Sequence, residues 1–392
     1  MTFSGTRDGA SPASSASASS ESSSASLRVC IVAPSLDILG GQAIVAQRLM
    51  AQLAAERDIR LSFLPHNPRL PHSLRILQRI KYVRTIVTSL AYVVSLLRQL
   101  RAQDVVHVFS ASYWSFLLAP TPAVLIGRWY GKRVILNYRS GEAADHLARW
   151  RRTALPVLRR ADRIVVPSGY LVDVFARFGL VAEPIVNFVD VGAMPYRARA
   201  VLRPHFLANR NFASHYNVAC VLRAFHLIQQ AVPEARLTVA GDGAERDMLR
   251  ALARELELRN IDFVGQVTMA RMWTLYDAAD IYLNAPSIDN MPNSVIESFA
   301  AGLPVVTTNA GGIPYIVTHE VNGLLVDCND HRAMANAALR LLADSHRGLR
   351  LAARARADVL AKYTWTAVRD EWRRAYGIGD GTAVGHTSRE LT

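Results

Sequence analysis

The 392-residue chain contains only three cysteines, and no two of them form a Cys-x-x-Cys pair. Cys30, Cys220 and Cys328 are too few and too scattered for a disulfide framework, and their spacing does not fit a structural zinc site. We therefore expect three free thiols in a reducing compartment, a cytoplasmic location and no metal site.

The chain also lacks an apolar run long enough to span a membrane. The most apolar segment, Thr85 to Leu97, has about 13 residues, whereas a spanning helix needs roughly 20. Residues 1–26 are mostly Ser and Ala and have no apolar region of the kind found in secretory signals. We expect them to form a disordered tail outside the fold.

Acidic residues are scarce between Arg69 and Arg160, where 16 Lys and Arg face only 3 Asp and Glu. The excess of +13 in this stretch equals the formal net charge of the whole chain, so an anionic partner should approach this region. Basic residues flank the apolar segment 85–97 on both sides, at Arg79, Lys81, Arg84, Arg98 and Arg101.

A helix with an apolar centre and basic ends can lie on an anionic membrane surface. It can equally pack on its own domain and keep its basic face in water, and both interpretations stay open at this point. Nucleic-acid binding is disfavoured, because the basic region contains no recognised nucleic-acid module.

Short apolar, β-branched runs alternate with helical patterns along most of the chain. In the first half they cover 27–33, 105–108, 134–136 and 163–166; after an interruption at 187–203 they cover 204–207, 236–240, 262–264, 281–283, 304–308 and 323–326. Buried strands that alternate with helices indicate parallel sheets covered on both faces. The sequence therefore predicts two doubly wound, Rossmann-like α/β domains that face a cleft, with ligands at the carboxyl ends of the strands.

We divide the chain accordingly. Residues 27–195 form the first domain and residues 196–360 the second. A helix at 361–376, rich in Tyr and Trp, is expected to pack on a domain, and a loose tail follows at 377–392.

Several loops after predicted strands carry residues that could bind a ligand. Gly40-Gly41 precedes a helix and lets backbone N–H groups approach a phosphate or a sugar, but it is equally a simple turn. Gly241-Asp242-Gly243 favours a tight strand-to-helix turn with Asp as a cap. Arg210 follows the first strand of the second domain and is a candidate phosphate ligand, although any surface Arg in this Arg-rich chain would look similar.

The polar loop from Asp289 to Asn293 leads into a short helix that contains Glu297. Both acids can face one cleft wall, and the amides at the helix start would point into the same cleft, where a phosphate could bind. The alternative is structural: Ser294-x-x-Glu297 has the spacing of a capping box, in which Glu297 only satisfies the helix end.

At this loop the sequence resembles the retaining nucleotide-sugar glycosyltransferases of family 4, which have the GT-B fold. The resemblance covers about residues 27 to 376, and it implies that the helix at 361–376 returns to the first domain. It rests on Asp289 to Glu297 with the following Gly302-Leu-Pro-Val-Val306, on Ala240-Gly-Asp-Gly243, on Phe263-Val-Gly265 and on Gly311-Gly-Ile-Pro314.

The resemblance implies a role for each matching position. Glu297 would bind the ribose hydroxyls of a nucleotide, Asp289 would lie beside the donor sugar, and Arg210 would neutralise the departing diphosphate. The remaining donor-binding positions would be Gly41, Gly265, Asn290, Met291, Pro292 and Asn293. No metal or other cofactor is implied, because cationic side chains and helix dipoles stabilise the leaving group.

Three positions depart from the family pattern. The first acid is Asp289 where Glu is usual, the Lys expected about five residues after Arg210 is absent, and Arg139 occupies the position of a His that often follows the third strand of the first domain. Two interpretations of Arg139 remain open: it supplies positive charge as a catalytic residue with Asp289 and Arg210, or the site has lost activity.

We therefore expect a retaining glycosyltransferase that moves a sugar from a nucleotide-sugar to a glycan or lipid-linked acceptor in polysaccharide or cell-surface glycoconjugate biosynthesis. The alternatives are a catalytically weakened binding protein of the same fold and a nucleotide-sugar epimerase. The basic first domain adds an anionic membrane surface as an expected partner, with the protein peripheral at its inner face.

Overall fold

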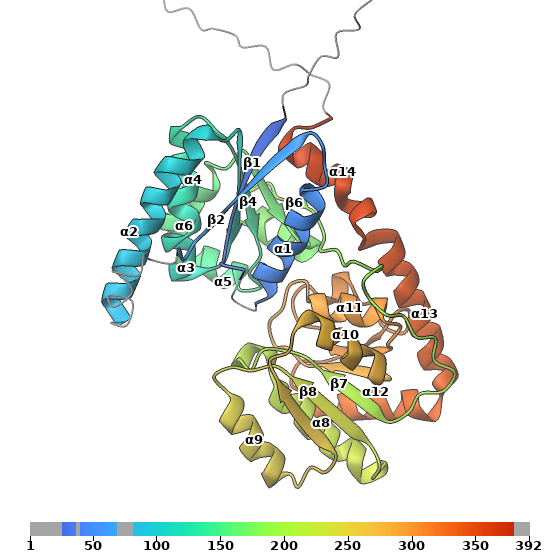
Figure 1. Cartoon of the computed structure of the whole chain (residues 1–392). Helices are drawn as coiled ribbons and strands as arrows, with labels where there is room; N and C mark the ends of the chain where they lie inside the picture. The colour runs from blue at the N-terminus through green and yellow to red at the C-terminus, as the bar shows by residue number, and fades with distance from the viewer. Residues whose placement is uncertain (1–25, 37–39, 69–80, 380–392) are drawn as a thin grey trace, which may run out of the picture.

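The computed structural model describes residues 26–36, 40–68 and 81–379, which form two α/β domains joined by two chain crossings (Figure 1). The predicted N-terminal tail and most of the predicted C-terminal tail lie outside the described residues.

The first domain is built on a six-stranded sheet in the order β2-β1-β3-β4-β5-β6, and its pairings are all parallel. The strands are β1 (Leu27–Ala33), β2 (Ile59–Pro65), β3 (Val105–Ser110), β4 (Arg133–Tyr138), β5 (Arg163–Val166) and β6 (Glu183–Pro184). The helices are α1 (Gly41–Leu53), α2 (Lys81–Gln99), η2 (Leu100–Ala102), α3 (Tyr113–Leu118), α4 (Pro120–Trp129), α5 (Ala143–Arg149), α6 (Arg151–Leu158) and α7 (Gly169–Ala176). The runs predicted at 105–108, 134–136 and 163–166 all fall in buried central strands.

The second domain has a parallel sheet in the order β12-β11-β10-β7-β8-β9. Its strands are β7 (His205–Ala208), β8 (Arg236–Ala240), β9 (Ile261–Gly265), β10 (Ile281–Asn284), β11 (Val305–Thr308) and β12 (Leu324–Val326). Its helices are η3 (Ser214–Tyr216), α8 (Val218–Ala231), α9 (Arg246–Glu255), α10 (Met269–Ala278), α11 (Asn293–Ala300), η4 (Ile313–Tyr315), α12 (His331–Ala343) and α13 (Ser345–Lys362). The strand order reverses between β7 and β10, and open α/β sheets bind ligands at such a switch point.

The C-terminal helix returns to the first domain. The predicted helix at 361–376 is two helices: α13 runs to Lys362, and α14 (Trp365–Tyr376) begins after a bend. Trp372 stacks on the His107 ring with centroids 5.0 Å apart, and the Tyr376 hydroxyl lies 2.8 Å from His107 Nδ1. The other crossing runs alongside, since the Val189 N–H donates to the Tyr363 carbonyl over 2.9 Å.

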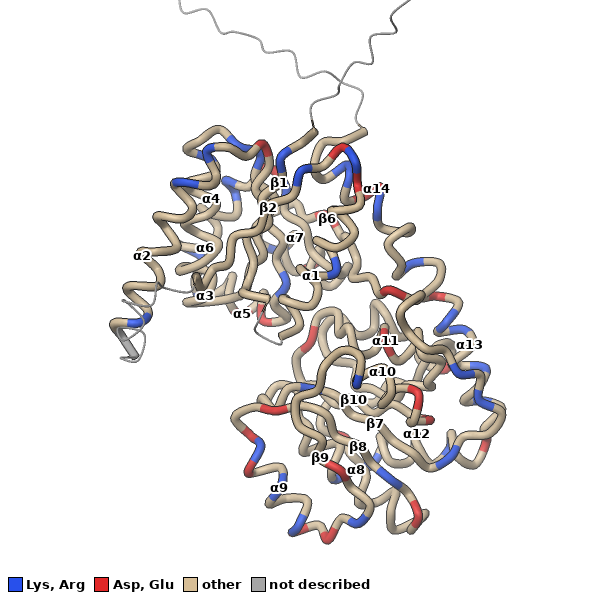
Figure 2. Tube along the Cα trace, viewed as in Figure 1, with Lys and Arg blue, Asp and Glu red and all other residues tan. Residues whose placement is uncertain are grey.

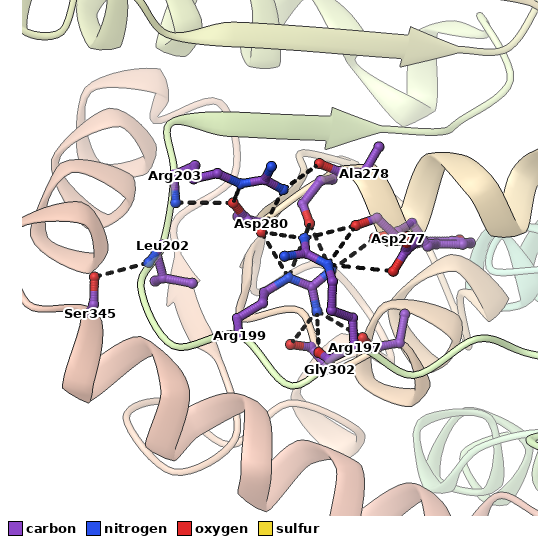
Figure 3. Close-up of polar contacts among 12 residues, drawn as sticks. Arg197, Arg199, Leu202, Arg203, Asp277, Ala278, Asp280, Gly302 and Ser345 are labelled. Atoms are coloured by element: carbon purple, nitrogen blue, oxygen red, sulfur yellow. Dashed lines mark hydrogen bonds and ion pairs between the residues drawn. The ribbon is translucent and has the colours of Figure 1, made fainter.

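The segment between β6 and β7, called the linker below, is held to the second domain by a cluster of ion pairs (Figure 3). The fully buried Asp280 accepts hydrogen bonds from the guanidinium groups of Arg197 (2.6 Å), Arg199 (3.0 Å) and Arg203 (2.5 Å). Arg199 also donates to the carbonyls of Ala301 (2.9 Å) and Gly302 (3.1 Å), which follow the last residue of α11. A cation at that end complements the helix dipole, so the cluster fixes the position of α11.

None of the helices in the described ranges is both long and apolar enough to cross a membrane. The apolar segment 85–97 lies in α2, which packs against α4. Tyr92 and Leu96 are buried there, whereas Ile86 and Leu90 are 67% and 64% exposed. Basic residues occur toward both ends of α2, at Arg84 and Arg98, whereas α9 contains residues of both signs of charge (Figure 2).

Candidate active site

Arg210 and Asp289 meet at the switch point of the second sheet. Arg210 follows β7 and Asp289 follows β10, and Nη2 of Arg210 donates to Oδ2 of Asp289 over 2.6 Å. Nη1 of Arg210 donates to the Ser294 hydroxyl over 3.0 Å, and the guanidinium lies 4.1 Å from the centre of the Tyr216 ring. Burial alone would lower the pKa of Arg210, but Asp289 and the neighbouring tyrosines together outweigh it and raise that pKa, so the group stays cationic.

Glu297 projects from the second turn of α11 between the domains. Its carboxylate accepts a hydrogen bond from the Tyr276 hydroxyl over 2.8 Å and one from Arg48 Nη2 over 2.6 Å. The capping-box interpretation is wrong, because no side chain caps the start of α11 and the Ser294 hydroxyl is the acceptor for Arg210. Ser294 and Glu297, the two side chains that could have capped the helix, instead contact arginines of the candidate site.

Arg48 is a site residue that the sequence analysis missed. It lies on α1 of the first domain, seven residues after Gly41, and therefore two turns along the same face of the helix. That spacing is the signal that could have identified it. Gly41 itself is the first residue of α1, and the extended Gly40 precedes it. The ion pair with Glu297 brings a second cation to the site and joins the two domains.

The loop from Asp289 to Asn293 is held by residues of the first domain. Nδ2 of Asn187 donates to the Met291 carbonyl (3.0 Å) and to Oδ1 of Asn293 (2.8 Å), and Ser168 bonds to the side chain of Asn290. Fewer backbone amides of this loop are free to donate to a phosphate than the sequence analysis expected. The Asn290 N–H donates to Oδ1 of Asp289 over 2.8 Å, and Pro292 has no N–H. Of the amides from Asn290 to Asn293, those of Met291 and Asn293 have no acceptor among the described residues.

Two glycines of the resemblance motifs are required by close packing around this loop. A Cβ on Gly312 would lie 2.0 Å from the Asn290 carbonyl oxygen, and a Cβ on Gly241 would lie 2.0 Å from that of Arg210. The Gly241 N–H donates to the Gly265 carbonyl over 2.9 Å, which helps to hold Gly241 against the Arg210 backbone. These glycines set the backbone positions of the site; no ligand contact is needed to explain them.

Arg139 lies at the carboxyl end of β4 and reaches the loop indirectly. Its guanidinium donates to Oδ1 of Asn137 over 3.3 Å and to Asn187, the residue that holds Met291 and Asn293. Among the described residues no carboxylate pairs with it, and burial lowers its pKa to about 10. The predicted catalytic role of Arg139 stays a prediction, since its described hydrogen bonds go to Asn137 and Asn187 and reach neither Asp289 nor Arg210.

In the ranges that the structure describes, no group of three or more His, Cys, Asp and Glu side chains is arranged to hold a metal ion. The arrangement near the switch point consists of two guanidinium groups, two carboxylates and the N-terminus of α11, held together by the contacts between Arg210 and Asp289 and between Arg48 and Glu297. Such a set can bind the hydroxyls of a ribose and a diphosphate at the same time.

Two family models match the chain. Residues 39–192 match the model described as "Glycosyltransferase Family 4", and residues 203–358 match "Glycosyl transferases group 1". Among curated proteins, the lipopolysaccharide core biosynthesis glycosyltransferase LpsE of Rhizobium meliloti is 31% identical over 231 residues, which is 56% of this chain and 65% of LpsE. The glycogen synthase of Mycobacterium tuberculosis is 25% identical over 292 residues, 70% of this chain and 68% of the synthase. The matches span 65%, 37% and 57% of three of the curated relatives.

Solved structures share the fold. Anabaena HepE, solved in complex with UDP and glucose, has a TM-score of 0.71 at 15% identity and covers 90% of this chain and 99% of its own. Sucrose-phosphate synthase of Thermosynechococcus elongatus has a TM-score of 0.68 at 19% identity and covers 90% and 98%. With the two parallel sheets, these neighbours establish a two-domain GT-B fold, as the sequence predicted.

Proposed function

Because the chain belongs to the group 1 glycosyltransferases, we propose that it transfers a sugar from a nucleotide-sugar donor to a glycan or lipid-linked acceptor. Polysaccharide or cell-surface glycoconjugate biosynthesis is the expected setting. The observation that carries the proposal is the assembly of Arg210, Asp289 and Glu297 at the switch point, within reach of the first domain.

Each side chain has a definite task in this proposal. Glu297 accepts hydrogen bonds from the two ribose hydroxyls, which replace or share its present bond with Arg48. Arg210 faces the diphosphate, and Asp289 orients both Arg210 and the sugar. The bond between the anomeric carbon and the diphosphate oxygen breaks, and its electron pair stays on the diphosphate. The acceptor oxygen bonds to the same carbon on the same face, and its proton passes to the departing phosphate, so that configuration is retained.

We propose that Arg48 supplies the positive charge that the missing Lys would have given. It is a second guanidinium in the cleft besides Arg210, and it comes from the opposite domain. Two cations and the N-terminus of α11 can stabilise a departing diphosphate by electrostatics alone, and we propose on this ground that transfer needs no added metal. An active enzyme is thereby favoured over a weakened binding protein.

The test is stabilisation by nucleotides. UDP, GDP, ADP and their sugars are added to the full chain, with and without EDTA, and the melting temperature is measured. A nucleotide at about 100 times its Kd adds roughly 2.7 kcal/mol to the free energy of unfolding. Glu297→Gln should lose the shift relative to its own unliganded melting temperature. Glu320→Gln is the matched control, because it breaks a Glu–Arg pair with Arg347 on the surface and should keep the shift.

Outcomes separate the alternatives. Transfer or slow hydrolysis of the stabilising nucleotide-sugar supports the transferase. Stabilisation without turnover supports a binding protein, and interconversion of free nucleotide-sugars supports an epimerase. If no nucleotide stabilises the protein, or if Glu297→Gln retains the shift, the assigned site is wrong.

We further propose that the first domain associates peripherally with the inner, anionic face of a membrane. Ile86 and Leu90 of α2 and Trp129 of α4 are exposed apolar side chains on helices that pack together, and Arg84, Arg128 and Lys132 lie nearby in sequence. Apolar side chains with basic neighbours suit the boundary between headgroups and acyl chains. Co-sedimentation with anionic vesicles should fall in Trp129→Ala and at high salt.

A further inference from the structure

A second exposed aromatic surface lies on the first domain, at the start of α3 and between α5 and α6. Trp114 of α3 packs edge to face on Trp150, with ring centroids 5.1 Å apart, and is still 66% exposed. Trp150 joins α5 to α6 and is half-buried. A large apolar ring left in water costs free energy, so a Trp pair that packs together yet stays exposed indicates a binding surface.

The neighbouring residues Tyr113 and Asp145 hold this Trp pair in place. Tyr113 has φ of 55°, in the left-handed region where a bulky residue is a genuine outlier. Its hydroxyl donates to Asp145, and its ring contacts Trp150 with centroids 6.2 Å apart. Asp145 is fixed by Arg149 over 2.7 Å. These contacts hold Tyr113 in a strained backbone conformation and so fix the position of the adjacent Trp114.

Helix α5 connects the pair to the candidate active site. The turn before α5 touches the donor loop, since a Cβ on Gly141 would lie 3.2 Å from the carbonyl carbon of Asp289. Asp145 lies in the first turn of α5, and Trp150 follows its last residue. Seven helical residues extend about 10 Å. In Figure 1, α3 and α5 lie along the edge of the first domain that faces the second domain.

We propose that Trp114 and Trp150 form a stacking platform for an inner sugar ring of an oligosaccharide acceptor. The proposal rests on the glycosyl transfer proposed above and names the class of its acceptor. The C–H faces of a pyranose ring pack on the electron-rich face of an indole, and the carboxylate of Asp145 accepts hydrogen bonds from sugar hydroxyls. Because the platform lies at the end of α5 away from Asp289, an acceptor that reaches both is longer than one sugar ring.

The experiment uses the full chain and a panel of α- and β-linked disaccharides of glucose, mannose, galactose and N-acetylglucosamine, with each monosaccharide alongside. Binding is measured by saturation-transfer NMR and by titration of Trp fluorescence. At least one disaccharide should bind more tightly than its monosaccharide. Its affinity should fall about tenfold in Trp114→Ala and be largely kept in Trp114→Phe, which retains an aromatic face.

Trp129→Ala is the matched control, because Trp129 is 73% exposed on the same domain but belongs to the α2–α4 surface. It should bind the disaccharide normally and lose binding to anionic vesicles, and Trp114→Ala should do the reverse. The proposal is overturned if no disaccharide binds, if both variants lose sugar binding equally, or if Trp114→Ala loses vesicle binding instead. Nucleotide stabilisation of Trp114→Ala should equal that of the unaltered chain; its failure in the unaltered chain would instead count against the proposed transfer.

Discussion

Replacing Asp280 with Asn should destabilise the second domain strongly. The substitution keeps the size of the side chain and removes the one carboxylate that three guanidinium groups share. Arg197 and Arg203 are partly exposed, so water replaces much of what they lose. Arg199 is fully buried and would keep only carbonyl acceptors. Breaking a buried pair by removing one partner costs about 3–5 kcal/mol, and we expect the loss to fall in that range.

Urea denaturation followed by far-UV circular dichroism measures this loss as a shift in midpoint. The comparison variant is Asp277→Asn, whose carboxylate contacts the same Arg197 over 3.4 Å but is half-exposed. That variant should lose at most about 1 kcal/mol. Because Arg199 also holds the carbonyls that follow α11, Asp280→Asn should weaken nucleotide binding as well. If Asp280→Asn and Asp277→Asn proved equally stable, the idea that the buried Asp280 carboxylate holds the linker in place would be refuted.

Two further outcomes follow from the structure. Gly312→Ala should displace the Asn290 backbone, because its Cβ would lie 2.0 Å from the carbonyl oxygen; a loss above about 2 kcal/mol and weaker nucleotide binding are expected, measured by the same denaturation and stabilisation assays. Burial, with the charge of Arg139, lowers the pKa of His107 to about 3, so the unfolded chain binds its proton below about pH 6.5 and the folded chain does not. Stability should therefore fall as the pH drops from 6.5 towards 3, by about 3 kcal/mol at pH 4.5 from this group, and His107→Gln should flatten that part of the profile.

Much of the fold could be predicted because strands buried in a parallel sheet have continuous apolar sequences. The run at 163–166 coincides with β5, and that at 236–240 coincides with β8. Strand β2 was missed, since Ile59–Pro65 is an edge strand that is only half-buried and therefore alternates in polarity. The break between α13 and α14 was missed as well, because it depends on Tyr363 meeting the other crossing, which is a contact between segments far apart in sequence.

The candidate site divides in the same way. Arg210 and Asp289 could be singled out because each follows a predicted strand, and Glu297 because it lies with Asp289 in one family motif. The choice between capping and ligand binding at Glu297 could not be made, since it turns on Arg48, which is 249 residues away. Arg139 is the converse case: its position was clear from the sequence, but whether it takes part in transfer stays a prediction.

The course of the chain has a consequence for how the protein is made. Helix α14 packs on the first sheet through Trp372 and Tyr376, and its Arg369 and Arg373 pair with Glu56 and with Asp58 respectively. The second domain is thus an insertion within the first, between β6 and α14. Synthesis of the first domain therefore begins before that of the second and ends after it, and until α14 arrives the His107 side of its sheet is covered by α1 but not by Trp372 and Tyr376. A fragment cut at the linker would leave that apolar surface open, so the first domain is best expressed with α14 rejoined to it through a short connection.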